Sequence, residues 1–115
     1  MTKIVWVSRH DMTMEQKADL ERIYGEVEIE KYDKTVNNVY EFMDVSADVY
    51  AVVLPIEKIA DLFLYTNKDI IHAVSERVEC GTTINPATGK KEKQYAFKHI
   101  CWKKYWKVDI QESRL

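Results

Sequence analysis

The middle of the chain changes its hydrophobic pattern in a way that predicts strand, helix and strand. Val49 to Leu54 is an apolar run rich in β-branched residues, which is typical of a strand buried on both faces. Pro55 suits the first position of a helix, and the apolar residues after it keep helical spacing: Ile56, Ile59, Ala60 and Phe63. Asp69 to Val74 predicts a second apolar strand. Strand, helix and strand within about thirty residues indicate the crossover unit of a parallel sheet.

The residues before this unit continue the alternation of strands and helices. Lys3 to Val7 predicts a first strand. Thr13 and Gln16 have the spacing of a capping box, which begins a helix that ends at Gly25. We also expect a short strand, Val27–Ile29, flanked by the outward glutamates Glu26, Glu28 and Glu30, and a short helix through Val36, Val39, Tyr40 and Met43, opened by Asp33 or Thr35.

The C-terminal third is predicted to contain a loop and two strands. Cys80 to Lys91 is expected to be a loop because its Asn-Pro and Thr-Gly pairs mark turns. The strands are Gln94–Trp102 and Tyr105–Gln111, and alternation in the second predicts that Trp106 is buried. Lys103-Lys104 is either a tight turn between the strands or a bulge in one long strand.

These elements predict the fold class α/β. We expect a small mixed sheet with a central β-α-β unit, flanking helices and a C-terminal antiparallel strand extension, in three layers or in two with an added hairpin. Residues 1–115 form a single domain, and the strands at about 94–111 are expected to be used in oligomerisation because exposed sheet edges favour pairing with another chain.

Composition narrows the class of protein. The 115 residues are 46% hydrophobic and 31% charged, which is typical of a folded domain. No apolar run approaches the ~20 residues that span a bilayer, and no signal-peptide pattern is present. Cys80 and Cys101 are expected to be reduced thiols. We therefore expect a cytoplasmic protein without membrane contact.

Charge is unevenly distributed in a protein whose formal net charge is −2. Residues 11–48 hold eleven acidic and four basic side chains, whereas residues 90–107 hold seven lysines against the single acid Glu92. The C-terminal part therefore favours an anionic partner. The alternative is a solvated lysine surface.

Ser8, Arg9 and His10 follow the first predicted strand and form the first candidate binding group. Ligands of open α/β sheets bind beyond the carboxyl ends of strands, and a hydroxyl, a guanidinium and an imidazole there suit phosphate. The glycines of a dinucleotide fingerprint or a P-loop are missing. In the alternative interpretation, Arg9 pairs with Asp11 and His10 faces water.

Arg77 is the second candidate, because it follows the strand that closes the central unit and is expected to bring another forked donor to the same rim. Its alternative role is an ion pair with Glu76 or Glu79. His72 lies within the apolar run of that strand and is predicted to be a hydrogen-bonded core histidine.

The third candidate group mixes aromatic rings with lysines near the C-terminus. Such mixtures stack on bases and neutralise phosphates in nucleotide and single-strand binders. Strand alternation places Tyr95, Phe97 and His99 on one face, with Lys98 and Trp102 on the other. In the alternative, the rings fill the core or a subunit interface.

No catalytic motif stands out. Paired carboxylates, a nucleophile elbow and zinc-ligand spacing are not found, and no cofactor is predicted. Two functional alternatives nevertheless stay open: a small phosphodiesterase of cyclic nucleotides that uses His10 or His99, and a protein inhibitor whose acidic N-terminal half mimics nucleic acid.

Four segments give the chain a resemblance to a known family: WVSRHDMT, ADVYAVVLPIEKIADLF, AVSERV and YAFKHICWKKYWKVDI. Together they resemble the type one Thoeris anti-defence proteins of phages. The resemblance implies a cytoplasmic protein of the infected host cell that sequesters a cyclic ADP-ribose signal, made by a TIR-domain enzyme, without cleaving it. It also implies dimers or higher oligomers that bind ligand between protomers, and in some members a separate site for cyclic oligonucleotides.

The resemblance places no binding residue on this chain, so the predicted ligand-binding set comes from the patterns above. It consists of Ser8, Arg9, His10, Arg77, Phe97, Lys98, His99, Trp102 and Arg114. Arg114 would contribute only if the C-terminal tail docks onto a partner protomer.

Overall fold

Two buried parallel strands, β1 (Thr2–Val7) and β3 (Val49–Val52), lie at the centre of the sheet in the computed structural model, which describes residues 1–107. β2 (Val27–Tyr32) pairs in parallel with β1, and β4 (Asp69–Ile84) pairs in parallel with β3. β5 (Lys91–Lys104) is antiparallel to β4, so the strand order is β2-β1-β3-β4-β5. The predicted mixed sheet with a C-terminal antiparallel extension is confirmed.

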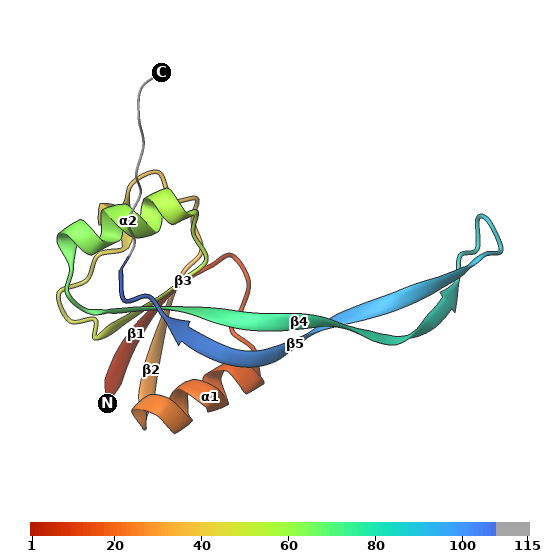
Figure 1. Ribbon diagram of the computed structural model, residues 1–115, viewed down its shortest axis with the longest axis horizontal. Helices are drawn as coiled ribbons and strands as arrows, with labels where there is room; N and C mark the ends of the chain where they lie inside the picture. The colour runs from red at the N-terminus through yellow and green to blue at the C-terminus, as the bar shows by residue number, and fades with distance from the viewer. Residues whose placement is uncertain (108–115) are drawn as a thin grey trace, which may run out of the picture.

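Helices cover both faces of the sheet and give three layers. α1 (Met14–Tyr24) lies on one face, and α2 (Ile56–Tyr65) with the short 3₁₀ helix η1 (Val39–Phe42) lies on the other (Figure 1). Side chains alternate between these layers along β1: Ile4 and Trp6 pack with Leu20 of α1, while Val5 and Val7 pack in the cluster of α2 and η1. Burial on both faces explains why β1 and β3 are continuous apolar runs.

Local capping explains where the helices begin and end. Thr13 and Gln16 form the predicted capping box, with the Gln16 amide donating to Thr13 Oγ1 over 3.1 Å. Gly25 ends α1 at a φ of +80°, a value that favours glycine. The expected start of the second helix was wrong, because Asn38 caps η1 through Tyr40 N at 2.9 Å.

β4 and β5 extend well beyond the body of the protein as a two-stranded ribbon (Figure 1). We call residues 75–100 the arm. The predicted loop at Cys80–Lys91 was mostly wrong, since β4 continues to Ile84 and only residues 85–90 form the turn. The β-branched Thr82, Thr83 and Ile84 suit a strand, and they pair with Lys93, Glu92 and Lys91.

The end of the described chain also differs from expectation. β5 runs through Lys103 and Lys104, so these lysines are neither a turn nor a bulge. Tyr105 N donates to Ile70 O over 2.8 Å, and its ring stacks on half-buried His72 with centroids 4.6 Å apart. Trp106, predicted to be buried, is 82% exposed, because residues 105–107 do not form a strand that would bring it against the core. The rest of the predicted strand, from Val108 to Gln111, lies outside the described residues.

Three smaller predictions have clear outcomes. Glu28 and Glu30 are exposed on β2, which forms one edge of the sheet. Cys80 and Cys101 are both free thiols. Across residues 1–107, no helix combines the length and apolar character needed to cross a membrane.

Candidate functional site

A hollow of about 330 Å³ lies beyond the carboxyl ends of β1 and β3, and we call it the edge hollow. From β1 the chain moves to β2 on one side, whereas β3 and β4 lie on the other side, so the strand order reverses between β1 and β3. Open α/β sheets bind ligands at such a switch point. The lining residues are Val7, Ser8, Arg9, His10, Lys34, Thr35, Val36, Val53, Leu54 and Pro55.

Hydrogen bonds fix the segment that carries the three predicted residues. Trp6 Nε1 donates to His10 O over 2.8 Å, and the His10 amide donates to Ser8 Oγ over 3.1 Å. Ser8 N donates to Tyr32 O over 3.1 Å, which joins this segment to the end of β2. Ser8, Arg9 and His10 therefore share one hollow, as expected from their position after β1.

The charges around the edge hollow are one-sided. Arg9 hydrogen-bonds to the hydroxyl of Thr35. The expected alternative, an ion pair between Arg9 and Asp11, is not formed, because Asp11 pairs with Lys31 over 2.7 Å and this ammonium lowers the pKa of Asp11. Among residues 1–107 the lining holds Arg9 and Lys34 but no carboxylate, although the whole protein carries a net charge of −2.

Lys34 and Thr35 are functional candidates that sequence reasoning missed. The sequence pattern indicated Thr35 only as a helix cap, and it assigned no role to Lys34. Both follow β2, whose carboxyl end lies at the same edge of the sheet as that of β1. Pro55, on the other side of the hollow, precedes α2 and makes no side-chain capping bond to the first turn of that helix.

A second group of predicted residues lies elsewhere. Phe97, Lys98 and His99 line a hollow of about 460 Å³ where the arm meets the start of α1, which we call the arm-base hollow. Glu15 also lines it, and a carboxylate makes the site less suitable for an anion. Six of the predicted residues are thus divided between two hollows on different elements.

His99 anchors the arm to α1. Its Nε2 lies 2.9 Å from Asp19 Oδ2, its side chain is 7% exposed, and this contact is the main reason why the pKa of Asp19 is lowered. The other ring nitrogen, Nδ1, is buried without a hydrogen-bond partner among residues 1–107. An enclosed nitrogen of this kind is poorly placed to exchange a proton with a bound substrate.

Trp102 is partly buried and packs against the core, and its predicted face was wrong. Its Nε1 donates to Gln16 O over 3.0 Å, and its ring meets Trp6 edge-on with centroids 5.8 Å apart. It also contacts His99, which was expected on the opposite face. The cause is an irregularity in pairing: Val74 faces Cys101 but Ser75 faces His99, so Ile100 is an extra residue that reverses the alternation.

Arg77 does not join the edge hollow. β4 continues past Val74, so Arg77 lies on the arm, where its guanidinium stacks 3.8 Å from the centre of the Tyr95 ring. The alternative role, an ion pair with Glu76 or Glu79, is not found among residues 1–107, and Glu79 instead pairs with Lys93 over 3.8 Å. Arg114 lies outside the described residues.

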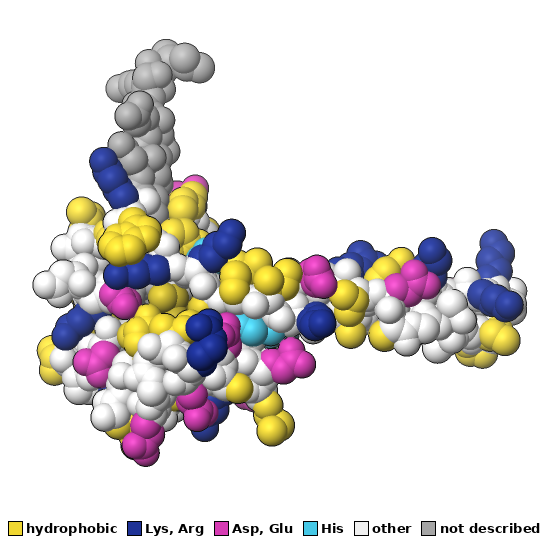
Figure 2. Space-filling model, turned by 60° about the horizontal axis from the view of Figure 1, so that its bottom comes forward, with side chains coloured by type: hydrophobic (Ala, Val, Ile, Leu, Met, Phe, Trp, Pro, Cys, Tyr) yellow, Lys and Arg dark blue, Asp and Glu magenta, His cyan; other side chains and the backbone are white. Residues whose placement is uncertain are grey.

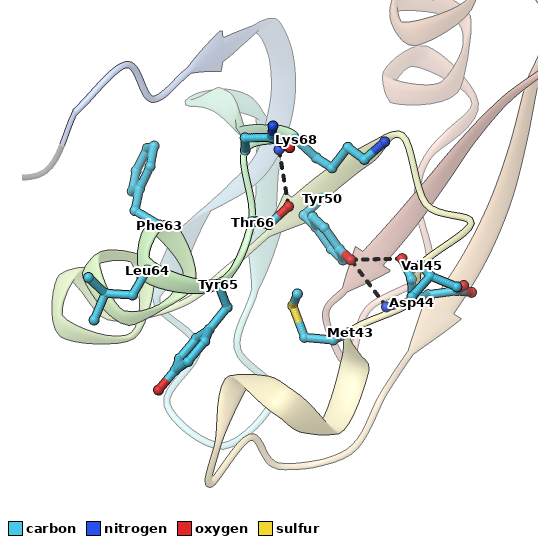
Figure 3. A pocket seen from close by; sticks show the side chains of 10 residues that line it. Met43, Asp44, Val45, Tyr50, Phe63, Leu64, Tyr65, Thr66 and Lys68 are labelled. Atoms are coloured by element: carbon cyan, nitrogen blue, oxygen red, sulfur yellow. Dashed lines mark hydrogen bonds between the residues drawn. The ribbon is translucent and has the colours of Figure 1, made fainter.

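A further hollow of about 630 Å³ was not predicted (Figure 3). It lies at the other end of the parallel strands, where β3 and β4 begin. Tyr50 is one of the lining residues. Its phenol oxygen accepts from Asp44 N over 3.1 Å and donates to Asp44 O over 3.0 Å. Phe63 and Thr66 line it from the carboxyl end of α2. Exposed carbonyls make that end of a helix unfavourable for anions, so this hollow suits an apolar ligand better than a phosphate.

Among residues 1–107, no group of three or more His, Cys, Asp or Glu side chains is arranged to hold a metal ion. Comparison with known proteins gives no relative: no protein-family model, curated protein or solved structure matches this chain.

Proposed function

We propose that this protein binds a small phosphate-bearing nucleotide in the edge hollow and sequesters it. The observation that carries the proposal is a hollow at the switch point between β1 and β3 that is lined by Arg9, His10 and Lys34 and, within the described part of the chain, by no carboxylate. A guanidinium fork, an ammonium and hydroxyls are the donors that phosphate oxygens prefer.

The size and lining of the hollow support a ligand with one charged end. Its volume of about 330 Å³ is at the lower limit of the ~300–1,000 Å³ of small-molecule pockets. A phosphate and its sugar fit that space, and the rest of a dinucleotide extends beyond it. Val36, Val53 and Leu54 supply apolar surface for a ribose or base edge.

The resemblance to the Thoeris anti-defence family gives this ligand a proposed identity, a cyclic ADP-ribose signal held intact in the cytoplasm of an infected cell. A cyclic ADP-ribose presents a diphosphate to cationic donors and two riboses to hydroxyls. The rival role as a phosphodiesterase has to rely on His10, because His99 is enclosed and paired with Asp19.

The test combines a binding measurement with recovery of the ligand. Isothermal titration with cyclic ADP-ribose and with linear ADP-ribose would compare wild type, the double variant Arg9→Glu/Lys34→Glu and the matched control Lys17→Glu/Lys68→Glu. The controls reverse the same number of charges at exposed sites outside the edge hollow. Removal of two charge-assisted hydrogen bonds predicts at least about 100-fold weaker binding in the first variant, and little change in the control.

Two results would contradict the proposal in different ways. Equal loss of affinity in both double variants, or no binding by wild type, would exclude the edge hollow as the site. Mass spectrometry of ligand released by heat denaturation should return the cyclic mass; a linear product would replace sequestration with hydrolysis.

A further inference from the structure

The arm carries large side chains that the body does not cover. Phe97 is 80% exposed, Ile84 66% and Tyr95 45%. Figure 2 shows hydrophobic, basic and some acidic side chains along the arm up to its tip. Because these apolar side chains mostly face solvent, they add little to the stability of the fold, and such exposed apolar surface often marks a site of interaction.

The pairing of β4 with β5 sorts the arm into two unlike faces. Successive strand residues point to opposite sides, so Lys91, Lys93, Tyr95 and Phe97 of β5 share one side. Arg77 pairs with Phe97 across the ribbon and stacks on Tyr95, so it belongs to the same side. We call these five residues the cationic-aromatic face. The pairs Glu76–Lys98, Val78–Ala96 and Thr83–Glu92 lie on the other side.

The charge of the arm is opposite to that of the protein. Residues 75–100 contain five basic and three acidic side chains, whereas the full chain has a net charge of −2. Glu79 pairs with Tyr95 across the ribbon and so lies on the same side as the cationic-aromatic face, where it forms an ion pair with Lys93 over 3.8 Å. Glu92, on the other side, accepts from Asn85 Nδ2 over 2.7 Å. The face therefore presents a positive field from a ribbon that projects away from the acidic body.

We propose that the cationic-aromatic face binds single-stranded nucleic acid. Bases stack on the open ring of Phe97 and on the guanidinium of Arg77, which its contact with Tyr95 holds flat at 3.8 Å. Lys91 and Lys93, nearer the tip, neutralise phosphates. From residue 91 to residue 97 a strand spans about 20 Å, which accommodates the shortest of the ~4–16 nucleotide sites of single-strand binders.

The composition of this face favours nucleic acid over a protein partner. Cores of protein interfaces are depleted in charged residues, especially lysine. Here two of the five side chains are lysines, and they lie on the same strand as the two rings. The site shares no residue with the edge hollow and goes beyond the nucleotide sequestration proposed above.

The test is fluorescence anisotropy with a labelled oligothymidine of about 12 nucleotides at about 50 and 200 mM salt. Phe97→Ala removes one stacking platform and should weaken binding about 5- to 150-fold. Lys91→Glu/Lys93→Glu should weaken binding and reduce the salt slope by about 1.4, or about 0.7 for each phosphate that a lysine no longer neutralises. Circular dichroism should show that all variants fold, because the substituted side chains are exposed.

Matched control variants test whether a loss of positive charge or apolar surface elsewhere on the protein also weakens binding. Lys68→Glu/Lys98→Glu makes the same charge change on the body and on the other side of the arm, and Leu64→Ala removes an apolar side chain that is 77% exposed on α2. Both should bind within about twofold of wild type. The pocket variant Arg9→Glu/Lys34→Glu should also bind oligothymidine normally, so failure of one proposal is distinguishable from failure of the other.

Four outcomes would overturn the inference. They are no binding at the lower salt concentration, equal loss of affinity in the charge control, a preference for duplex over single strands, and a change of oligomeric state in Phe97→Ala without a change in oligothymidine binding. The last outcome would make the face an interface between copies of this chain.

Discussion

Aromatic residues lie on strands in both the body and the arm, but their surroundings differ completely. Trp6 of β1 and Tyr50 of β3 are 3% and 1% exposed, because helices cover both faces of the central strands. Phe97 of β5 is 80% exposed, although the same sheet continues into the arm. An aromatic ring on a strand therefore stabilises the fold where helices cover that strand, and it is available to a partner where they do not.

Hydrogen exchange should show the largest contrast between the two regions. Amides of β1 and β3 are expected to exchange only on global unfolding, which typically costs about 5–15 kcal/mol. Amides of the outer arm, residues 76–84 and 91–98, should open locally and exchange at least about a thousand times faster. Exchange measured by mass spectrometry would contradict this view of the arm if both regions were equally protected.

Truncating a side chain in the body should lower the free energy of unfolding by several kcal/mol more than truncating one on the arm. Leu62 is fully buried against the sheet, so Leu62→Ala should lower the free energy of unfolding by about 2–5 kcal/mol. Phe97→Ala should change it by less than about 0.5 kcal/mol, because most of its ring already faces solvent. Urea denaturation checks both, and a costly Phe97→Ala would show that the ring packs within the protein.

The junction between the regions should respond to acid. His99 lowers the pKa of Asp19 from its ordinary value near 3.8, so the ionised carboxylate is favoured in the folded state. This contribution to stability is present above that value and is lost as the pH falls through the lower pKa of the folded protein. Asp19→Asn should cost about 1–3 kcal/mol at neutral pH.

The readout for this junction is urea denaturation between about pH 2 and 7. The difference between wild type and Asp19→Asn should shrink as the pH falls. The exposed Glu21→Gln is a matched control on the same helix. A constant difference at every pH would show that Asp19 acts through packing and not through its charge.

Tyr24 should give the smallest effect, on the body side of the comparison. Burial raises its pKa to about 12, and the nearby carboxylate of Asp69, whose Oδ2 lies 3.1 Å from the phenol oxygen, adds to the shift. The raised pKa contributes stability that is complete below about pH 10 and is lost as the pH rises through 12. Ultraviolet titration should show one tyrosine fewer ionising near pH 12 in Tyr24→Phe than in wild type.

The elements of the body were predicted well because each is marked by a pattern of a few neighbouring residues. The Thr13–Gln16 capping box and the apolar run at Val49 identify their elements within a few residues. The arm was missed because turn residues show where a turn lies but not how far the flanking strands extend. Pairs such as Thr83 with Gln94, joined by a 2.8 Å side-chain bond, are not visible in either segment alone.

The sequence predicted only those site residues whose place follows from their position directly after a strand. Ser8 to His10 were identified because they follow a strand. Lys34 was missed because its position depends on which strand lies beside β1. Arg77 was placed at the wrong site because β4 was expected to end at Val74, and the face of Trp102 was wrong because the extra residue Ile100 leaves no mark in the alternation.

The antiparallel pairing of the arm makes its length independently adjustable. Adding or removing two residues on each strand moves the tip by about 7 Å and keeps every side chain on its own face. Nothing in the three-layered body has to change, since residues 76–98 contribute no buried side chain to it. Insertions of two residues in each strand would therefore change the distance between the body and the tip of the arm while the core stays the same.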